Sequence, residues 1–234
     1  MSARAVFLDR DGTLVHPRHY PARPDELVLY DGIGPELRAL QRAGFKLVVV
    51  TNQSGIAHGY LTEAQLVRLH AHLTGQLAQL GVRLDAIYHC PHHPDAAIPA
   101  LAVACDCRKP RPGMLLAAAT NLNLDLAASW LVGDILDDIE AGNRAGCRGL
   151  LVDLGTESAP ATRLRTPAYV ARDTAHALGI IAALEGCAVP GTAPDLRYRP
   201  AAWRRPFPRW PWLTAPRPAP THTRSTEETY ASAH

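Results

Sequence analysis

The pentapeptide Asp9-Arg10-Asp11-Gly12-Thr13 directly follows the apolar run Ala5-Val6-Phe7-Leu8. A short apolar run that ends in a polar turn with a glycine is typical of a buried parallel strand and the loop after it. Ligands of parallel sheets bind beyond the carboxyl ends of the strands. We therefore expect this loop to line a site, and the rest of the chain to supply further strands beside the first.

Short apolar runs and helical patterns alternate along residues 1–189. Strands that alternate with helices indicate a parallel sheet covered on both faces. Thr62-Glu63-Ala64-Gln65 resembles a capping box, which opens a helix. The apolar face of that helix is expected to contain Leu66, Leu69, Leu73, Leu77 and Leu80. The expected strands are Ala5–Leu8, Lys46–Val50, Ala86–Tyr88, Trp130–Val132 and Gly149–Val152, and the other expected helices are Pro35–Ala43, Met114–Thr120, Asp138–Ala145 and Thr174–Leu184.

The overall composition is that of a folded domain. Apolar residues make up 47% of the 234 residues and charged residues 20%, which is enough to bury a sizeable core. The net charge is +2, so the whole chain lacks the basic character of a nucleic-acid binder. No stretch approaches the roughly 18 uncharged apolar residues of a transmembrane helix, and the first apolar run is too short for a signal peptide. We expect a cytoplasmic monomer that binds neither nucleic acid nor membrane.

The composition changes near residue 190. Residues 190–234 hold nine of the 20 prolines and three of the four tryptophans, and their seven Arg against three acidic residues give a net charge of +4. Residues 1–189 have a net charge of −2. Because proline blocks helix and sheet, we expect a folded domain at 1–189 and a mostly disordered tail at 190–234. The tail is either an inert extension, which we favour, or a segment that docks an unknown partner through Trp203, Trp210 and Trp212.

Polar residues gather at the ends of three predicted strands and in one loop. They are Asp9 and Asp11 after the first strand, Thr51 after the second, Asp134 after a later one, and Lys109 in a loop between them. Carboxylates that lie close together repel one another, and Mg²⁺, which prefers oxygen ligands, would hold them. With Lys109 and Thr51 as donors, such a site suits a phosphoryl group. A carboxylate can then attack phosphorus and form an aspartyl-phosphate.

These residues resemble, in order, the four motifs of the haloacid dehalogenase (HAD) superfamily of phosphatases, over about residues 4–185. The fourth motif is Gly133-Asp134-Ile135-Leu136-Asp137-Asp138. The resemblance implies an α/β fold: a HAD-like, Rossmannoid three-layer sandwich with a parallel sheet and no cap domain. Asp138 of the fourth motif is then an outer metal ligand or a support for the helix start, where Asp137 also lies.

The resemblance also implies a role for each motif residue. Asp9 would attack phosphorus, and Asp11 would protonate the leaving alcohol and then activate water. Asp9, Asp134 and the main-chain carbonyl of Asp11 would hold Mg²⁺. Thr51 and Lys109 would stabilise the phosphoryl oxygens, since phosphoryl transfer rests mainly on positioning and charge.

Three of the five cysteines lie in a second cluster, Cys90-Pro91-His92 and Cys105-Asp106-Cys107. Three thiolates and one imidazole are the ligand set of a closed tetrahedral zinc site, which has no open position for catalysis. A structural zinc ion would fix a long loop and the Lys109 that follows it. The alternative is a set of reduced, buried cysteines. The expected zinc ligands are Cys90, His92, Cys105 and Cys107.

The run Cys-Pro-His-His-Pro, followed by Cys-Asp-Cys-Arg-Lys-Pro, resembles the HAD subfamily that contains heptose-bisphosphate and histidinol-phosphate phosphatases. Residues 51–60 are more similar to the heptose enzymes. The resemblance implies a Mg²⁺-dependent hydrolase that removes the C7 phosphate of a small phosphorylated sugar, D-glycero-D-manno-heptose 1,7-bisphosphate. Histidinol phosphate or another small phosphate ester is the alternative substrate. The implied substrate contacts are Asn52, Gln53, Ser54, Arg108, Arg18, His19 and Tyr20.

Two positions depart from the subfamily pattern. Pro17–Tyr20 reads Pro-Arg-His-Tyr where relatives often have Asp-His-Gly-Tyr, and Ile135 stands where some relatives have Lys. A non-enzymatic alternative is a zinc-loop binding module that docks acidic partners through the basic tail. Such a module has no need of the full set of acids, hydroxyl and lysine, so we favour the enzyme.

Overall fold

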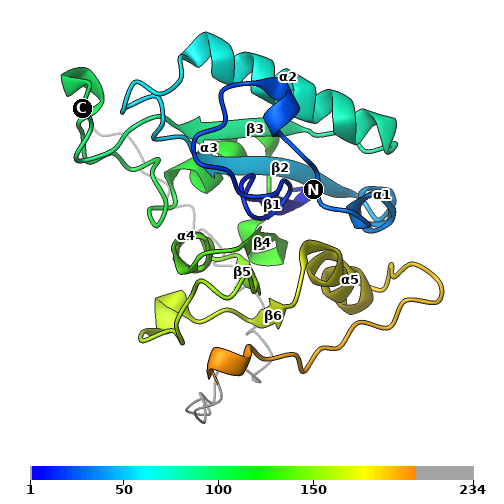
Figure 1. Cartoon of the computed structure of the whole chain (residues 1–234). Coiled ribbons are helices and arrows are strands. Elements are labelled where there is room, and N and C mark those ends of the chain that lie inside the picture. The colour runs from blue at the N-terminus through cyan, green and yellow to red at the C-terminus, as the bar shows by residue number, and fades with distance from the viewer. Residues whose placement is uncertain (1, 204–234) are drawn as a thin grey trace, which may run out of the picture.

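The computed structural model describes residues 2–203. Six parallel strands form one sheet in the order β3-β2-β1-β4-β5-β6, with β1 and β4 at its centre (Figure 1). The strands are all parallel, as the alternation of strands and helices predicts, and the first strand lies between β2 and β4. The strands are β1 (Arg4–Leu8), β2 (Phe45–Asn52), β3 (Ala86–Cys90), β4 (Trp130–Gly133), β5 (Arg148–Val152) and β6 (Tyr169–Ala171).

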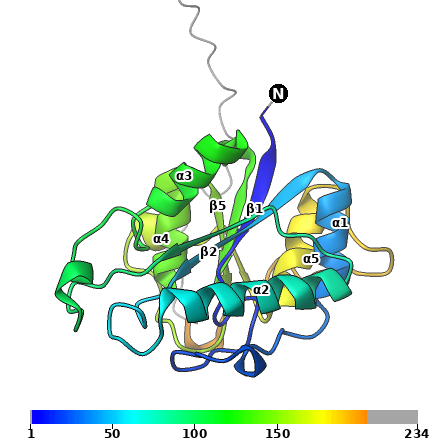
Figure 2. The same ribbon diagram turned by 90° about the horizontal axis from the view of Figure 1, so that it is seen from above.

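Helices cover both faces of the sheet and make the molecule a three-layer sandwich (Figure 2). Side chains of α1, α2 and α5 pack with the sheet in one apolar core, and side chains of α3 and α4 contribute to a second core on the opposite face. The fold thus has the predicted class. The helices are α1 (Ile33–Arg42), α2 (Glu63–Gln79), α3 (Gly113–Leu122), α4 (Leu136–Ala145) and α5 (Thr174–Leu184).

The predicted capping box at the start of α2 is confirmed. The Thr62 hydroxyl accepts a hydrogen bond from the main-chain N–H of Gln65, and the Gln65 side chain accepts one from the N–H of Thr62. Four of the five leucines predicted to face the core are fully buried. The prediction for Leu80 is wrong: the helix ends at Gln79, and Leu80 is 38% exposed because its position is no longer set by the helical repeat.

All five predicted strands and all five predicted helices are present, with small differences at their ends. The sixth strand was not predicted, because Tyr169–Ala171 is only three residues long and has too few positions to show a repeat. Among residues 2–203, the segments between strands hold single α-helices, short 3-10 turns and loops, and none forms a separate cap domain. No described helix is long and apolar enough to cross a membrane.

The packed structure continues past the predicted division at residue 189. Tyr198 donates a hydrogen bond from its hydroxyl to Asp153 at 2.8 Å, and the indole N–H of Trp203 donates to the main-chain oxygen of Glu157 at 3.0 Å. The Trp203 side chain is only 4% exposed. It packs into a small apolar cluster beside β5 and β6 that contains Leu136, Ile139, Leu151 and Val170. Residues 204–234, with Trp210 and Trp212, lie outside the described part, so the disordered tail and its docking role stay predictions there.

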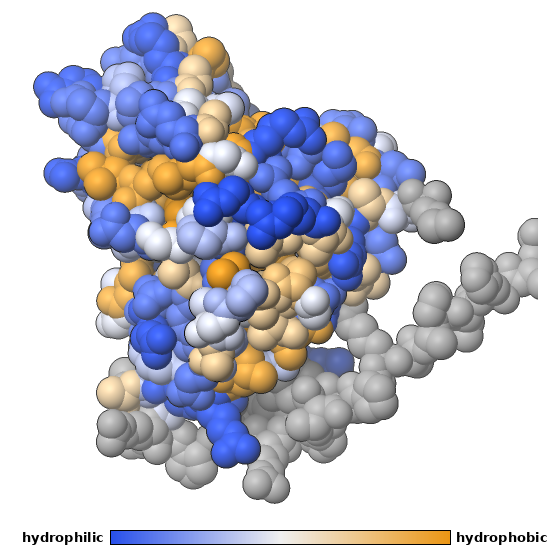
Figure 3. Space-filling view, turned by 90° about the vertical axis from the view of Figure 1, so that its right-hand side faces the viewer, coloured by the Kyte–Doolittle hydropathy of each residue, from blue (hydrophilic) through white to orange (hydrophobic). Residues whose placement is uncertain are grey.

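One face of the molecule mixes hydrophilic and hydrophobic side chains. Figure 3 shows the face that lies at the right of Figure 1, where patches of hydrophobic side chains lie among hydrophilic ones. Leu184 at the end of α5 and Leu196 in the following segment are 38% and 39% exposed. Single exposed apolar residues of this kind are normal in soluble proteins.

The buried indole of Trp203 leads to a test of the C-terminal segment. We expect Trp203→Ala to lower the free energy of unfolding by about 3 kcal/mol, because a large apolar side chain leaves a cavity. Leu196→Ala, in the same segment but exposed, should change it by less than about 0.5 kcal/mol. Urea unfolding followed by circular dichroism measures both, and equal midpoints for the two variants would contradict the packing of Trp203.

Candidate active site

The predicted catalytic residues meet at the carboxyl edge of the central strands. Asp9 directly follows β1, Asp134 directly follows β4, and Thr51 lies near the end of β2. The ammonium of Lys109, from the loop before α3, lies 2.6 Å from Oδ1 of Asp9 and 2.5 Å from Oδ1 of Asp138. The same ammonium donates to the main-chain oxygen of Val50 at 2.8 Å. One buried lysine therefore joins the loop after β1, strand β2 and the first turn of α4.

Acidic charge exceeds basic charge at this point. Ligand oxygens of Asp9, Asp134 and Asp138 lie within 4.8 Å of one another, and Lys109 is the cation that contacts two of the three. Burial, partly offset by Lys109, raises the pKa of Asp9 to about 7. Burial together with Asp9 and Asp138 raises the pKa of Asp134 to about 8. A set of close, underneutralised oxygen donors fits a hard divalent cation such as Mg²⁺.

Lys109 is held along its whole length. The Asn52 side chain accepts a hydrogen bond from the main-chain N–H of Lys109 and donates one to its carbonyl, both at 3.1 Å. Burial alone would lower the pKa of the Lys109 ammonium, but Asp138 and Asp9 outweigh burial and raise this pKa above its ordinary value. The lysine therefore keeps its positive charge, and its position is fixed at both the main chain and the ammonium.

Asp11 lies in a network with a buried arginine and a glutamine. Oδ2 of Asp11 accepts from Arg10 and from Nε2 of Gln53, each at 3.0 Å. Nε2 of Gln53 also donates to the Thr51 hydroxyl at 2.8 Å, while Oε1 of Gln53 accepts from Arg10 at 2.8 Å. Because the Thr51 oxygen accepts this bond, its own hydrogen remains free to be donated to a phosphoryl oxygen. Gln53 thus orients two predicted catalytic side chains at once.

Two glycines allow the acidic residues to approach the main chain closely. A Cβ on Gly12 would overlap the carboxylate of Asp134, and a Cβ on Gly133 would overlap that of Asp138. Gly12 also has a φ of 83°, in the left-handed region that favours glycine. The Thr13 hydroxyl is 3.4 Å from Asp134, and the hydroxyl of Thr174 at the start of α5 donates to the Thr13 carbonyl at 2.6 Å.

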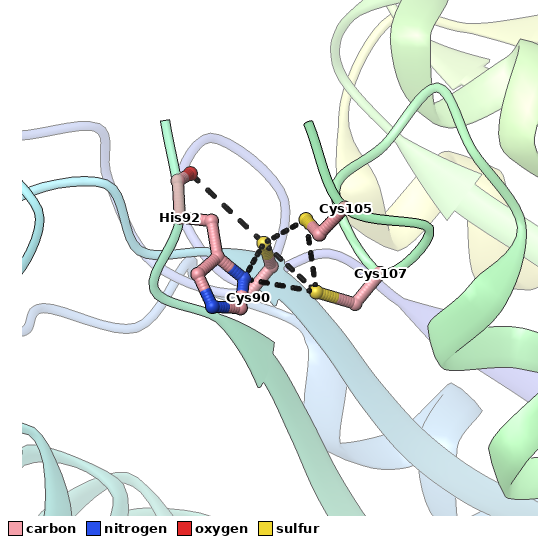
Figure 4. Close-up of side chains that lie close together, drawn as sticks. All are labelled: Cys90, His92, Cys105 and Cys107. Atoms are coloured by element: carbon pink, nitrogen blue, oxygen red, sulfur yellow. Dashed lines mark hydrogen bonds between the residues drawn. The ribbon is translucent and has the colours of Figure 1, made fainter. Parts of the chain in front are cut away.

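The cysteine cluster is assembled as predicted (Figure 4). Sulfur atoms of Cys90, Cys105 and Cys107 lie 3.1 to 3.5 Å apart, and Nδ1 of His92 is 3.4 Å from the Cys107 sulfur. All four residues can offer ligand atoms within 4.8 Å of one another. Burial raises the pKa of the Cys105 thiol, but hydrogen bonds from Cys107 and the Arg108 main chain outweigh it and lower this pKa to about 7. The cluster has the donor set and the spacing of a structural zinc site.

The remaining predicted substrate contacts lie in the loop after β1, in the loop after β2 and beside the cysteine cluster. His19 and Tyr20 belong to a group of rings in which the centroids of contacting rings lie 4.5 to 6.3 Å apart, and Tyr20 has a positive φ of 49°. Arg18 is exposed, and Ser54 is partly buried in the loop after β2. Arg108 donates to the main-chain oxygen of His92 at 3.2 Å, which ties it to the cysteine cluster. The other rings of the group are Tyr60, His58 and His93.

Sequence reasoning named Asp138 as a support for the helix start but missed its ion pair with Lys109, and it missed Arg10 altogether. Asp138 not only accepts from the N–H of Ile135 at the start of α4 but also pairs with Lys109, whereas Asp137 lies in the first turn and pairs with Arg165. Arg10 lies between the two motif aspartates and was not singled out. Arg10 comes only two positions after the apolar run that ends at Leu8, and a charged residue so close to a buried strand is a usable signal, because a buried charge needs a partner.

The fold and this site define the class of the protein. A HAD-hydrolase-like family model matches residues 106–177. A solved HAD-like protein from Mesorhizobium loti is 39% identical, with a TM-score of 0.70 over 82% of this chain and 90% of that chain. D,D-heptose 1,7-bisphosphate phosphatase of B. bronchiseptica, solved with magnesium and phosphate, is 33% identical, with a TM-score of 0.65 over 77% of this chain and 99% of that one. The class is that of the HAD-like hydrolases.

Sequence comparison identifies the family within this class. The D-glycero-beta-D-manno-heptose-1,7-bisphosphate 7-phosphatases of Yersinia pestis and Escherichia coli K12 are each 49% identical to this chain over 140 residues. The match covers 60% of this chain and 74% and 73% of those proteins. The chain belongs to this family of HAD-like phosphatases, and it is therefore a phosphoric ester hydrolase rather than a binding module.

The raised pKa values of Asp9 and Asp134 predict how a divalent cation changes stability with pH. Folding raises both from 3.8, to about 7 and about 8, so their contribution is full below about pH 4 and is lost as the pH rises through 8. A divalent cation binds the ionised carboxylates and offsets this loss. We expect Mg²⁺ at about 30 times its dissociation constant to raise Tm by about 5 °C at pH 8 and by clearly less at pH 5.5.

Differential scanning fluorimetry with and without Mg²⁺ measures the Tm shift at each of the two pH values. Groups that titrate without binding Mg²⁺ affect both samples at a given pH equally, so they largely cancel from this shift. Asp134→Asn is the control, since it should remove most of the Mg²⁺-dependent shift at pH 8. A shift that is the same at both pH values would contradict the titration of these carboxyl groups.

The geometry of the cysteine cluster predicts a bound zinc ion, and the molar ratio of zinc to protein can be measured. We expect about one zinc ion per wild-type chain and none in Cys105→Ser, because a hydroxyl is a poor replacement for a thiolate ligand. Cys187→Ser, outside the cluster, should keep its zinc. Elemental analysis of the purified proteins gives the ratio, and limited proteolysis within residues 91–104 should become faster only in Cys105→Ser. Equal zinc contents in the two variants would exclude the cluster as the binding site.

Proposed function

We propose that this phosphatase hydrolyses the C7 phosphate ester of D-glycero-beta-D-manno-heptose 1,7-bisphosphate. The observation that carries the proposal is the buried group formed by Asp9, Lys109 and Asp134 at one sheet edge, in a chain 49% identical to enzymes named for this reaction. The similarity covers about three quarters of those enzymes. A small phosphorylated sugar is therefore the substrate class that agrees best with both.

The first chemical step joins Asp9 to the phosphoryl group. A carboxylate oxygen of Asp9 forms a bond to phosphorus while the bond from phosphorus to the C7 oxygen breaks. Asp11 gives its proton to the leaving oxygen, which departs as the sugar hydroxyl. Lys109 and the free hydroxyl hydrogen of Thr51 offset the charge on the phosphoryl oxygens.

The second step returns the enzyme to its starting state. Asp11, now ionised, takes a proton from a water molecule as that water attacks phosphorus. The bond from phosphorus to Asp9 breaks, and inorganic phosphate leaves. Arg10 and Gln53 keep Oδ2 of Asp11 occupied in this structure, so the carboxyl group is held beside Thr51 through both steps.

Two metal ions complete the proposal. Asp9, Asp134 and the main-chain carbonyl of Asp11 would hold Mg²⁺, which supplies positive charge beside the phosphoryl group. Cys90 and its three cluster partners would hold a structural zinc ion, which fixes the loop that ends at Arg108 and Lys109. Arg108 is the proposed contact for the rest of the substrate, because its planar guanidinium suits a phosphate or a pair of hydroxyls.

The remaining sequence predictions stay as proposals beside this one. We keep a cytoplasmic, monomeric enzyme and a tail after residue 203 whose partner is undefined. Histidinol phosphate is the second candidate substrate, supported only by the resemblance of the cysteine loop to a subfamily that includes such enzymes.

Kinetics on the two esters test the substrate and the nucleophile together. We expect kcat/KM for the heptose bisphosphate to exceed that for histidinol phosphate by at least about tenfold, which corresponds to 1.4 kcal/mol of transition-state discrimination. Asp9→Asn should lose about a thousandfold or more of the activity, because an amide is a poor nucleophile. Phosphate release in the presence of Mg²⁺ measures both. A preference for histidinol phosphate would overturn the proposed substrate, and an active Asp9→Asn variant would overturn the covalent route.

A further inference from the structure

Arg10 is a fully buried cation with a defined set of acceptors. Its side chain is 0% exposed, although it lies between two residues of the catalytic loop. Nε and Nη2 both contact Oδ2 of Asp11, at 3.0 and 2.8 Å, and Nη2 also donates to Gln53. Nη1 points elsewhere and lies 3.4 Å from Nε2 of His70 on α2. Within residues 2–203, His70 is the acceptor that Nη1 meets.

The protonation state of His70 follows from this contact. A guanidinium has only N–H donors, so Nε2 of His70 must be the unprotonated, accepting nitrogen of a neutral ring. Burial, with Arg10 and His89 beside it, lowers the pKa of His70 to about 3, so the ring stays neutral at physiological pH. The His89 ring lies against it with centroids 5.8 Å apart, and His89 is itself 3.2 Å from Glu63. His70 is therefore placed from both sides.

The two oxygens of Asp11 have different surroundings. Oδ2 accepts hydrogen bonds from Nε of Arg10 and Nε2 of Gln53 and forms an ion pair with Nη2 of Arg10, whereas Oδ1 is buried and has no hydrogen-bond partner among the described residues. Oδ2 therefore ties the Asp11 carboxyl to two nitrogens of the Arg10 guanidinium and to the Gln53 amide, so the plane of the guanidinium sets the orientation of the carboxyl.

We propose that His70 is a positioning residue for the acid–base step. By accepting from Nη1, it fixes the plane of the Arg10 guanidinium, and Arg10 in turn fixes the orientation of the Asp11 carboxyl. This proposal rests on the acid–base role proposed above for Asp11. Among the described residues, the hydrogen bond of the His70 ring goes to Arg10 and not to a catalytic carboxylate, so its effect on catalysis passes through Arg10.

A purely structural role for His70 makes the opposite prediction for two substitutions. If the ring only fills space on α2, leucine should replace it well and glutamine poorly, since leucine is apolar and similar in size. If the ring serves as an acceptor, His70→Gln should restore function through its side-chain carbonyl, and His70→Leu should not. The two variants therefore separate packing from hydrogen bonding.

The test compares an ester that needs an acid with one that does not. The heptose bisphosphate loses a basic alkoxide that must be protonated, whereas p-nitrophenyl phosphate loses a stable phenolate. We expect His70→Leu to reduce kcat/KM about tenfold for the sugar ester and less than twofold for the aryl ester, with His70→Gln close to wild type on both. His72→Leu, on the same helix but outside the contacts of Arg10, is the matched control. Circular dichroism and Tm report whether each variant is folded.

Each outcome decides between the possibilities. Equal losses on the two esters, or a His70→Leu variant that matches wild type, would overturn the proposal. Asp11→Asn, measured on the same esters, distinguishes a failure of the His70 proposal from a failure of the proposed acid–base mechanism. If Asp11→Asn shows the selective loss and His70→Leu does not, only the role of His70 is wrong. If Asp11→Asn affects both esters equally, its role as the acid is wrong, and the role of His70 falls with it.

Discussion

The ammonium of Lys109, buried between Asp9 and Asp138, is the interaction on which the site depends. A charge in this position is tolerated only with partners of opposite sign at hydrogen-bond distance, and loss of one partner of such a pair typically costs about 3–5 kcal/mol. The lysine precedes α3, while its partners follow β1 and start α4. The ion pairs of Lys109 therefore form only when the loop before α3, the loop after β1 and the start of α4 are all packed together at the edge of the sheet. The same charge that stabilises this arrangement is available to a phosphoryl group.

The sequence predicted the central architecture because its signals are local and strong. The run before Asp9, the capping box at Thr62 and the strands between helices are each visible within a few residues. The sequence pattern failed for a strand that is too short to show a repeat and for a residue that lies past the end of a helix. Tyr169–Ala171 pairs with β5 at the edge of the sheet through only three residues, and Leu80 lies one residue past the end of α2. The pairing of this short strand and the exposure of Leu80 depend on the tertiary structure rather than on a sequence repeat.

In the site, sequence motifs identified the groups that can do chemistry but not those that hold them. Asp9, Thr51, Lys109 and Asp134 carry charges or hydroxyls in a recognisable order, and the structure brings them together. Asn52 was expected at the substrate, yet its side-chain amide makes two hydrogen bonds to the main chain of Lys109. Contacts of this kind join residues far apart in the chain, as Lys109 and Asn52 are, and no local pattern records them.

The packing of Gly12 against Asp134 and of Gly133 against Asp138 has a consequence for how the site can change. The separation between these carboxylates and the neighbouring loops is set by main-chain atoms, which cannot rotate away as a side chain can. A core substitution that moved β1 toward β4 by a few tenths of an ångström would press backbone against carboxylate without any change in a site residue. The packing of the apolar core of the sheet therefore determines how far the carboxylates of the cation site can move. Selection for catalysis acts on these core residues as well as on the site residues.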